Sequence, residues 1–213
     1  GNCERRGEYL DAVTDLLVTD LEWMVAQWAP GNDGNYRAQL TAADADQGIQ
    51  KMLFGMGSLS LGELAGERMK VALEANSYED EHDCFSDNTH NSHYYNGLGI
   101  QNVYTGTYQR VDGSLVTGPS LSDLVEQTNP ELDARLNTQL DNSMAALGVM
   151  KARAESSQNP MAFDEMIGPG NAEGEQIITN SILALVEQTG SIEQAARELG
   201  ISALSPDDAG HAF

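Results

Sequence analysis

Side chains that could do chemistry are densest between Glu79 and His90. This short segment contains five carboxylates, two histidines and one cysteine. Glu81, His82, Asp87 and His90 could supply mixed oxygen and nitrogen ligands to a divalent metal ion. The segment lacks the regular Cys or His spacing of zinc motifs, so an acidic loop whose Asp and Asn side chains cap turns is an equal alternative.

A second pair of acidic side chains precedes this segment. Glu63 and Glu67 are four residues apart, which places both on one face of a helix. Two carboxylates so placed can hold a hard cation or a ferric ion. The alternative is a solvated face, or ion pairs with Arg68 or Lys70. Gly62 and Gly66 favour close packing of this turn against a neighbouring helix, where a buried acid needs a partner.

The composition limits the kinds of partner. The chain of 213 residues has 33 acidic residues and 11 Lys and Arg, a formal net charge of -22. Such a surface repels nucleic-acid phosphates and anionic lipid headgroups, and it attracts cations. No apolar run approaches the roughly 20 residues that span a bilayer, so no transmembrane segment is expected. Nucleic acid is excluded as a partner on the same electrostatic ground.

Apolar periodicity predicts an all-α fold, an up-and-down bundle of about four long helices joined by long irregular loops. The whole chain, 1–213, is expected to form this one bundle. The long helices are expected at 3–28, about 44–76, about 130–154 and about 172–189, with short helices at 120–128 and from Ser191.

The expected loops are long. Residues 77–119 are predicted to be irregular and functional, with a short hairpin turning at Asp112-Gly113. A second loop is expected at 156–171, and the tail 205–213 is expected to fray.

The sequence resembles the imelysin family of bacterial iron-regulated envelope proteins over nearly its whole length. The runs that carry the resemblance are Asn2–Arg6, Glu8–Leu10, Thr14–Leu17, Gly55–Ser60, Gly62–Met69, Glu81–His90, Gly99–Tyr104 and Gly118–Leu121.

The resemblance implies two helical bundles in tandem, of which this chain resembles the C-terminal one. The family signature, Gly-x-His-x-x-Glu, lies in the N-terminal bundle, and here no His is followed three residues later by Glu. The resemblance also implies a periplasmic or outer-membrane-associated protein that binds a metal or another ligand in iron acquisition. A metallopeptidase whose motif lies outside this chain is the alternative. No catalytic residue is assigned, and the enzyme question stays open.

The predicted site lies on the second half of the helix at 44–76 and on the loop after it. Glu63, Glu67, Arg68, Asp87 and His90 are expected to converge on one polar pocket that opens toward an N-terminal bundle. Glu63, Glu67 and His90 are the expected metal ligands, and carboxylates with imidazole suit iron or another divalent metal. The alternative is a set of internal ion pairs and caps without a ligand.

Two further expectations concern the cysteines and the docking face. If the first two long helices are antiparallel neighbours, Cys3 and Cys84 lie close enough for a disulfide in an oxidising envelope compartment. The helix at 44–76 carries glycines on one side and Met52 and Met56 on another, which predicts a partly apolar face for a second bundle.

Overall fold

The computed structural model describes residues 2–201, 205–208 and 210. In these residues the fold is all-α, 72% helical, with one short hairpin. The predicted class is therefore confirmed, but the expected count of about four long helices is wrong. The chain divides into two compact units, residues 1–48 and 49–213, which are described separately.

The first unit consists of α1 (Cys3–Trp28) and α2 (Tyr36–Ala42). The turn between them is held by Asn35, whose side chain donates to the carbonyls of Ala26 and Ala29 and accepts from the amide of Ala38. The ring of Trp28 packs edge-on against Tyr36, with centroids 5.3 Å apart. No residue of α1 is buried.

The second unit begins within α3 (Ala45–Ser58), which continues without interruption into η1 (Leu59–Lys70) and α4 (Val71–Ala75). The remaining elements are η2 (Tyr78–Asp80), α5 (Thr89–Thr105), β1 (Thr107–Gln109), β2 (Leu115–Thr117), α6 (Leu121–Thr128), α7 (Pro130–Ala154), α8 (Phe163–Met166) and α9 (Ala172–Glu198).

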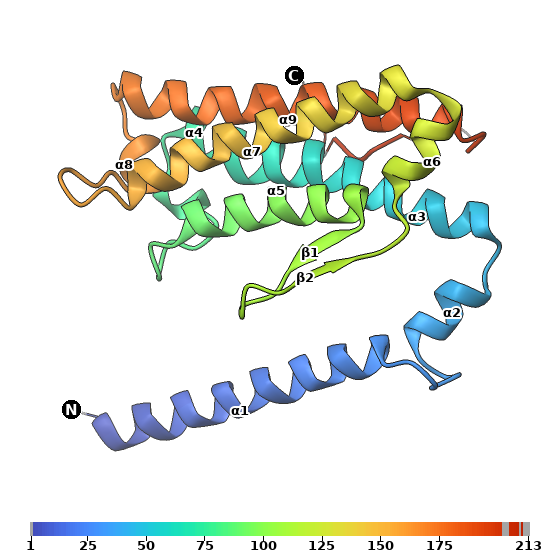
Figure 1. The fold of residues 1–213 in the computed structure, drawn as a ribbon. Coiled ribbons are helices and arrows are strands. Elements are labelled where there is room, and N and C mark those ends of the chain that lie inside the picture. The colour runs from blue at the N-terminus through green and yellow to red at the C-terminus, as the bar shows by residue number, and fades with distance from the viewer. Residues whose placement is uncertain (1, 202–204, 209, 211–213) are drawn as a thin grey trace. The chain divides into compact units, whose positions relative to one another are not determined.

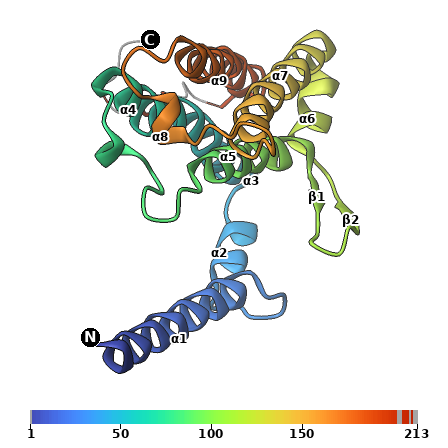
Figure 2. The same ribbon diagram turned by 90° about the vertical axis from the view of Figure 1, so that its left-hand side faces the viewer.

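Long helices form the body of the second unit (Figure 1). α9 packs against α7 and η1, and α7 packs against α5. Figure 2 shows these helices end-on, gathered around their shared interior. The core has two clusters of buried apolar side chains. One contains Leu53, Tyr104 and Leu136, and the other contains Leu64, Met150 and Phe163.

The segment 77–119, expected to be irregular, contains the 17-residue helix α5. Its Gly, Asn and Tyr residues are weak helix formers, which is why the sequence suggested a loop. Burial of Ile100 and Tyr104 in the first cluster outweighs that weak propensity. The predicted hairpin is present, with Tyr108 opposite Val116 and Gly113 at φ 83°.

Two helix boundaries also differ from expectation. The last helix expected from Ser191 is part of α9, which runs unbroken to Glu198 because Ile192, Ala195 and Ala196 extend its buried face. Of the tail, residues 209 and 211–213 lie outside the described part. Asp207 donates its amide to the Ser58 hydroxyl at 3.0 Å, so this part of the tail contacts α3.

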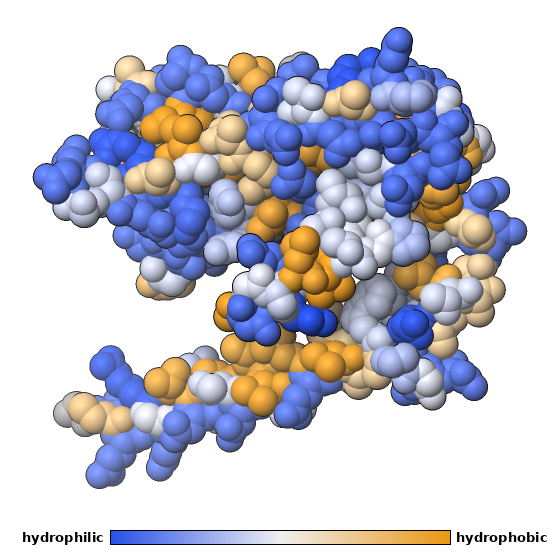
Figure 3. All heavy atoms as spheres, in the orientation of Figure 1, coloured by the Kyte–Doolittle hydropathy of each residue, from blue (hydrophilic) through white to orange (hydrophobic). Residues whose placement is uncertain are grey.

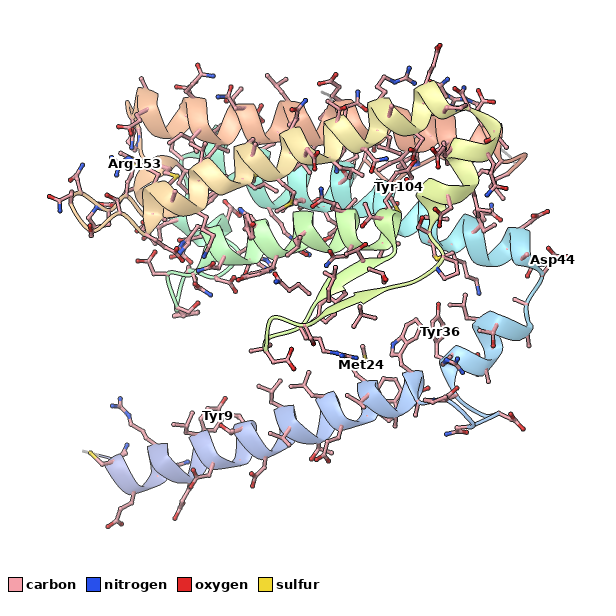
Figure 4. All side chains as sticks on the ribbon, viewed as in Figure 1. Tyr9, Met24, Tyr36, Asp44, Tyr104 and Arg153 are labelled. Carbon is pink, nitrogen blue, oxygen red and sulfur yellow. The ribbon has the colours of Figure 1, made fainter. Side chains whose placement is uncertain are left out.

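Tyr104 links α5 to the helices around it. Its side chain is fully buried, and its hydroxyl donates to Asp133 of α7 at 2.8 Å. Ser122 of α6 and Asn137 of α7 donate to the same carboxylate oxygen. Burial, followed by the bond to Asp133, raises the pKa of the Tyr104 hydroxyl. Figure 4 labels Tyr104 where α5 approaches α6.

The expected disulfide is absent: Cys3 and Cys84 are both free and exposed. The prediction required α1 to pack against the next long helix. Cys3 begins α1 in the first unit, and Cys84 belongs to the second unit. None of the helices in the described residues is long and apolar enough to cross a bilayer.

Glycine substitutions in α9 test the close packing of its first turn. A Cβ on Gly174 would overlap the backbone of Met166, whereas one on Gly190 would meet nothing within 4 Å. We expect Gly174→Ala to lower the free energy of unfolding by about 2–4 kcal/mol, because backbone must move. Gly190→Ala is the matched control, expected to raise it by up to about 1 kcal/mol. Urea unfolding followed by circular dichroism measures both, and equal effects would contradict this packing.

Candidate functional site

Three of the predicted site residues lie on η1, which is a π-helix. Its hydrogen bonds join residues five apart instead of four, and the amide of Val71 donates to the carbonyl of Gly66. The same spacing brings Arg68 to Glu63, whose carboxylate lies 3.1 Å from the guanidinium.

The opposite side of η1 is buried against α9. Leu64, Ala65 and Met69 belong to the second core cluster. The Ser60 hydroxyl donates to the carbonyl of Leu185 at 2.9 Å, and the Gln188 amide donates to the Ser60 hydroxyl at 2.8 Å. These bonds fix how η1 is turned about its axis, and hence where its exposed carboxylates point.

The loop after α4 is held by Thr89, the first residue of α5. The Thr89 hydroxyl donates to Glu81 at 2.6 Å and accepts from the amide of Asp83 at 3.0 Å. Burial raises the pKa of Glu81, the bond from Thr89 opposes that rise, and the charges of Asp164, Asp87 and Asp83 add to it. The loop therefore has a fixed conformation between α4 and α5.

The exposed side of η1, this loop and the tail residue Asp207 border an open polar hollow of about 560 Å³. Its lining consists of Glu63, Glu67, Arg68, Asp80, His82 and Asp207. Four carboxylates thus meet one guanidinium and one imidazole, and Arg68 is already paired with Glu63. The charge balance of the hollow suits a cation.

His82 contacts a second, buried histidine, His93. The rings of His82 and His93 stack with centroids 6.4 Å apart, and Phe163 meets His93 edge-on at 5.0 Å. His93 is fully buried, and neither ring nitrogen has a hydrogen-bond partner among the described residues. Burial, with smaller contributions from the charges of His82, Arg68 and His90, lowers the pKa of His93 to about 3. His93 is therefore a neutral imidazole.

Asp87 and His90 are not part of this hollow. Asp87 is exposed in the left-handed conformation at φ 52°, and its amide closes a turn onto Asp83. His90 is nearly buried, with Nε2 3.7 Å from Glu155, which also pairs with Lys151 at 2.7 Å. The structure therefore brings Glu63, Glu67 and Arg68 together and leaves Asp87 and His90 in the caps and ion pairs of the neighbouring loop.

Sequence analysis did not place Asp80 or Asp207 in the site, and it considered His82 only as one of several loop ligands. The position of His82 in the segment rich in carboxylates and histidines could have pointed to it, whereas nothing in the sequence links Asp207 to η1. Among the described residues, no group of three or more His, Cys, Asp or Glu side chains is placed to hold a metal ion. Glu63, Glu67 and His90 do not form such a group.

The fold and the hollow define a helical protein with an acidic, cation-attracting pocket. The sequence of residues 3–192 matches the family described as Imelysin (Peptidase_M75), and the chain belongs to this family. A search among curated proteins gave no match.

The buried imidazole predicts an acid-dependent loss of stability. A histidine with a folded-state pKa near 3 and an ordinary value of 6.5 contributes stability above pH 6.5 that is lost as the pH falls toward 3. We expect His93→Leu to remove this part of the pH dependence, which amounts to about 5 kcal/mol at complete titration.

Thermal unfolding from pH 7 to pH 3.5, followed by circular dichroism, measures the effect, with the unaltered chain as control. The account is wrong if the Tm values of the two proteins fall in parallel over this range.

Proposed function

We propose that this chain is the C-terminal bundle of an imelysin-family protein of the bacterial envelope, and that it binds a metal ion or cationic ligand in iron acquisition. The site is shared with an N-terminal helical bundle, present in the same protein or as a separate chain. Glu63, Glu67 and Arg68 are this chain's contribution from the predicted set, together with Asp80 and His82.

The observation that carries this proposal is the acidic hollow, with four carboxylates in its lining. Its carboxylates favour iron, manganese or another hard divalent cation, and His82 adds one imidazole. The described residues do not themselves gather three ligands around a point, and in this proposal the remaining ligands come from a partner or from the ligand itself. A site shared between two bundles satisfies both facts.

The first unit supports the presence of a helical partner. On α1, Leu10, Leu17, Leu21, Met24 and Trp28 are each at least half exposed. Figure 3 shows apolar side chains gathered along α1, and Figure 4 shows Tyr9 and Met24 projecting from it. An apolar helix face of this extent marks an interface. On α3, Met52 is partly exposed, but Met56 is buried and unavailable to a partner.

A metallopeptidase is the second candidate, favoured by the family match alone. In that case the His-x-x-Glu motif would lie in the N-terminal bundle, and the present hollow would shape the cleft. Measuring proteolysis of casein by the two-bundle protein, with and without a chelator, separates the two functions.

Glu67→Gln tests the site directly. We expect it to weaken Mn²⁺ binding by about tenfold or more, because it removes one negative charge from the hollow. The Tm should change little, since Glu67 is exposed. Electron paramagnetic resonance of Mn²⁺ with the two-bundle protein measures the binding.

Glu74→Gln is the matched control: Glu74 lies one helical turn beyond Lys70, with which it pairs at 3.1 Å, and it does not line the hollow. Equal Mn²⁺ affinity of the Glu67→Gln variant and the unaltered protein, with a lowered Tm, would show that Glu67 has a structural role only.

The apolar face of α1 gives a separate prediction. We expect Leu17→Glu to abolish association with a co-expressed N-terminal bundle, because it places a charge in a desolvated interface. Asp15→Asn, on the acidic side of the same helix, should leave association unchanged. Size-exclusion chromatography with light scattering reports the complex, and association of the Leu17→Glu variant would contradict the proposed interface.

A further inference from the structure

The ion pair between Glu63 and Arg68 joins residues five apart on one helix. In an α-helix, side chains five residues apart point about 140° away from each other around the axis. In a π-helix they lie on the same side of the helix, because the backbone hydrogen bonds join positions five apart. The 3.1 Å contact is therefore a property of the π backbone of η1.

The π backbone also reconciles two packing requirements. Upstream, α3 buries Leu53 and Met56, and downstream, α4 buries Ala72. Between them, η1 buries Leu64 and Met69 and still presents the carboxylates on its other side. Each π hydrogen bond spans one residue more than an α hydrogen bond, so the side chains of η1 point in other directions than an α-helix would give them.

We infer that the π register of η1 is the positioning device of this site. It turns Glu63, Glu67 and Arg68 into one hollow, and relaxation of this segment to an α-helix separates Arg68 from Glu63 and disassembles the hollow. The expected effect on cation binding rests on the proposed function. The hydrogen-bond register of η1 is independent of any ligand. The affinity of the hollow for a cation then depends on the backbone conformation of η1 as well as on its side chains.

The register is measured first, without a ligand. Scalar couplings across backbone hydrogen bonds in the NMR spectrum of the deuterated chain identify which carbonyl accepts each amide. We expect the amide of Val71 to couple to the carbonyl of Gly66, its partner in the structure. Coupling to the carbonyl of Glu67 instead would show an α-helix and would overturn the inference.

The consequence for binding is measured with a deletion. Removing Leu61 takes one residue out of η1 and allows an α-helix, while Glu63, Glu67 and Arg68 all remain. We expect Mn²⁺ affinity to fall at least as far as in Glu67→Gln. Deletion of Gln158, in the exposed loop after α7, is the control and should leave Mn²⁺ binding unchanged.

The outcomes separate the inference from the proposed function. Absence of Mn²⁺ binding by the unaltered two-bundle protein would contradict the proposed function and the binding part of the inference, while the NMR couplings still decide the register. Binding by a folded Leu61 deletion with unchanged affinity would overturn the positioning role. If the deletion variant does not fold, the register measurement on the unaltered chain decides the inference alone.

Discussion

The packing of η1 against α9 is the constraint on which the rest of the structure depends. Ser60 bonds to the backbone of Leu185 and to Gln188, and Leu64 and Met69 fill the core on the same side. A helix fixed in this way can present only its remaining surface to solvent. With π geometry, that surface carries Glu63, Glu67 and Arg68. The interior of the bundle therefore determines the chemistry of the hollow.

The loop after α4 completes the hollow, and its conformation too is fixed by contacts with buried residues. Thr89 holds Glu81 and Asp83, and the buried ring of His93 supports His82. In a chain with a formal net charge of -22, a lining of four carboxylates with one paired guanidinium concentrates an already negative field. Such a field attracts cations, and a second bundle could supply the ligands that the described residues do not provide.

The sequence predicted what depends on local patterns. The helices at α1 and α7, the uninterrupted helix through α3 and α4, and the Asp112-Gly113 hairpin all follow from periodicity and turn residues. Sequence patterns failed for α5, which was expected to be irregular. Its helix is stabilised by tertiary contacts that no local pattern shows, namely the burial of Tyr104 in the core and the bond of its hydroxyl to Asp133. The sequence could place Glu63 and Glu67 on one face, since they share a face in either helix type, and both line the hollow. An ion pair with Arg68 was one of the alternatives for these carboxylates, and its formation with Glu63, five residues away, follows from the π geometry of η1.

The most direct test of a cation site in this hollow is the position of the bound metal. Crystals of the two-bundle protein soaked with Mn²⁺ should give an anomalous difference peak between Glu67 and His82, with further ligands from the N-terminal bundle. A peak elsewhere, with the hollow closed by the Glu63–Arg68 pair and free of metal, would contradict the account.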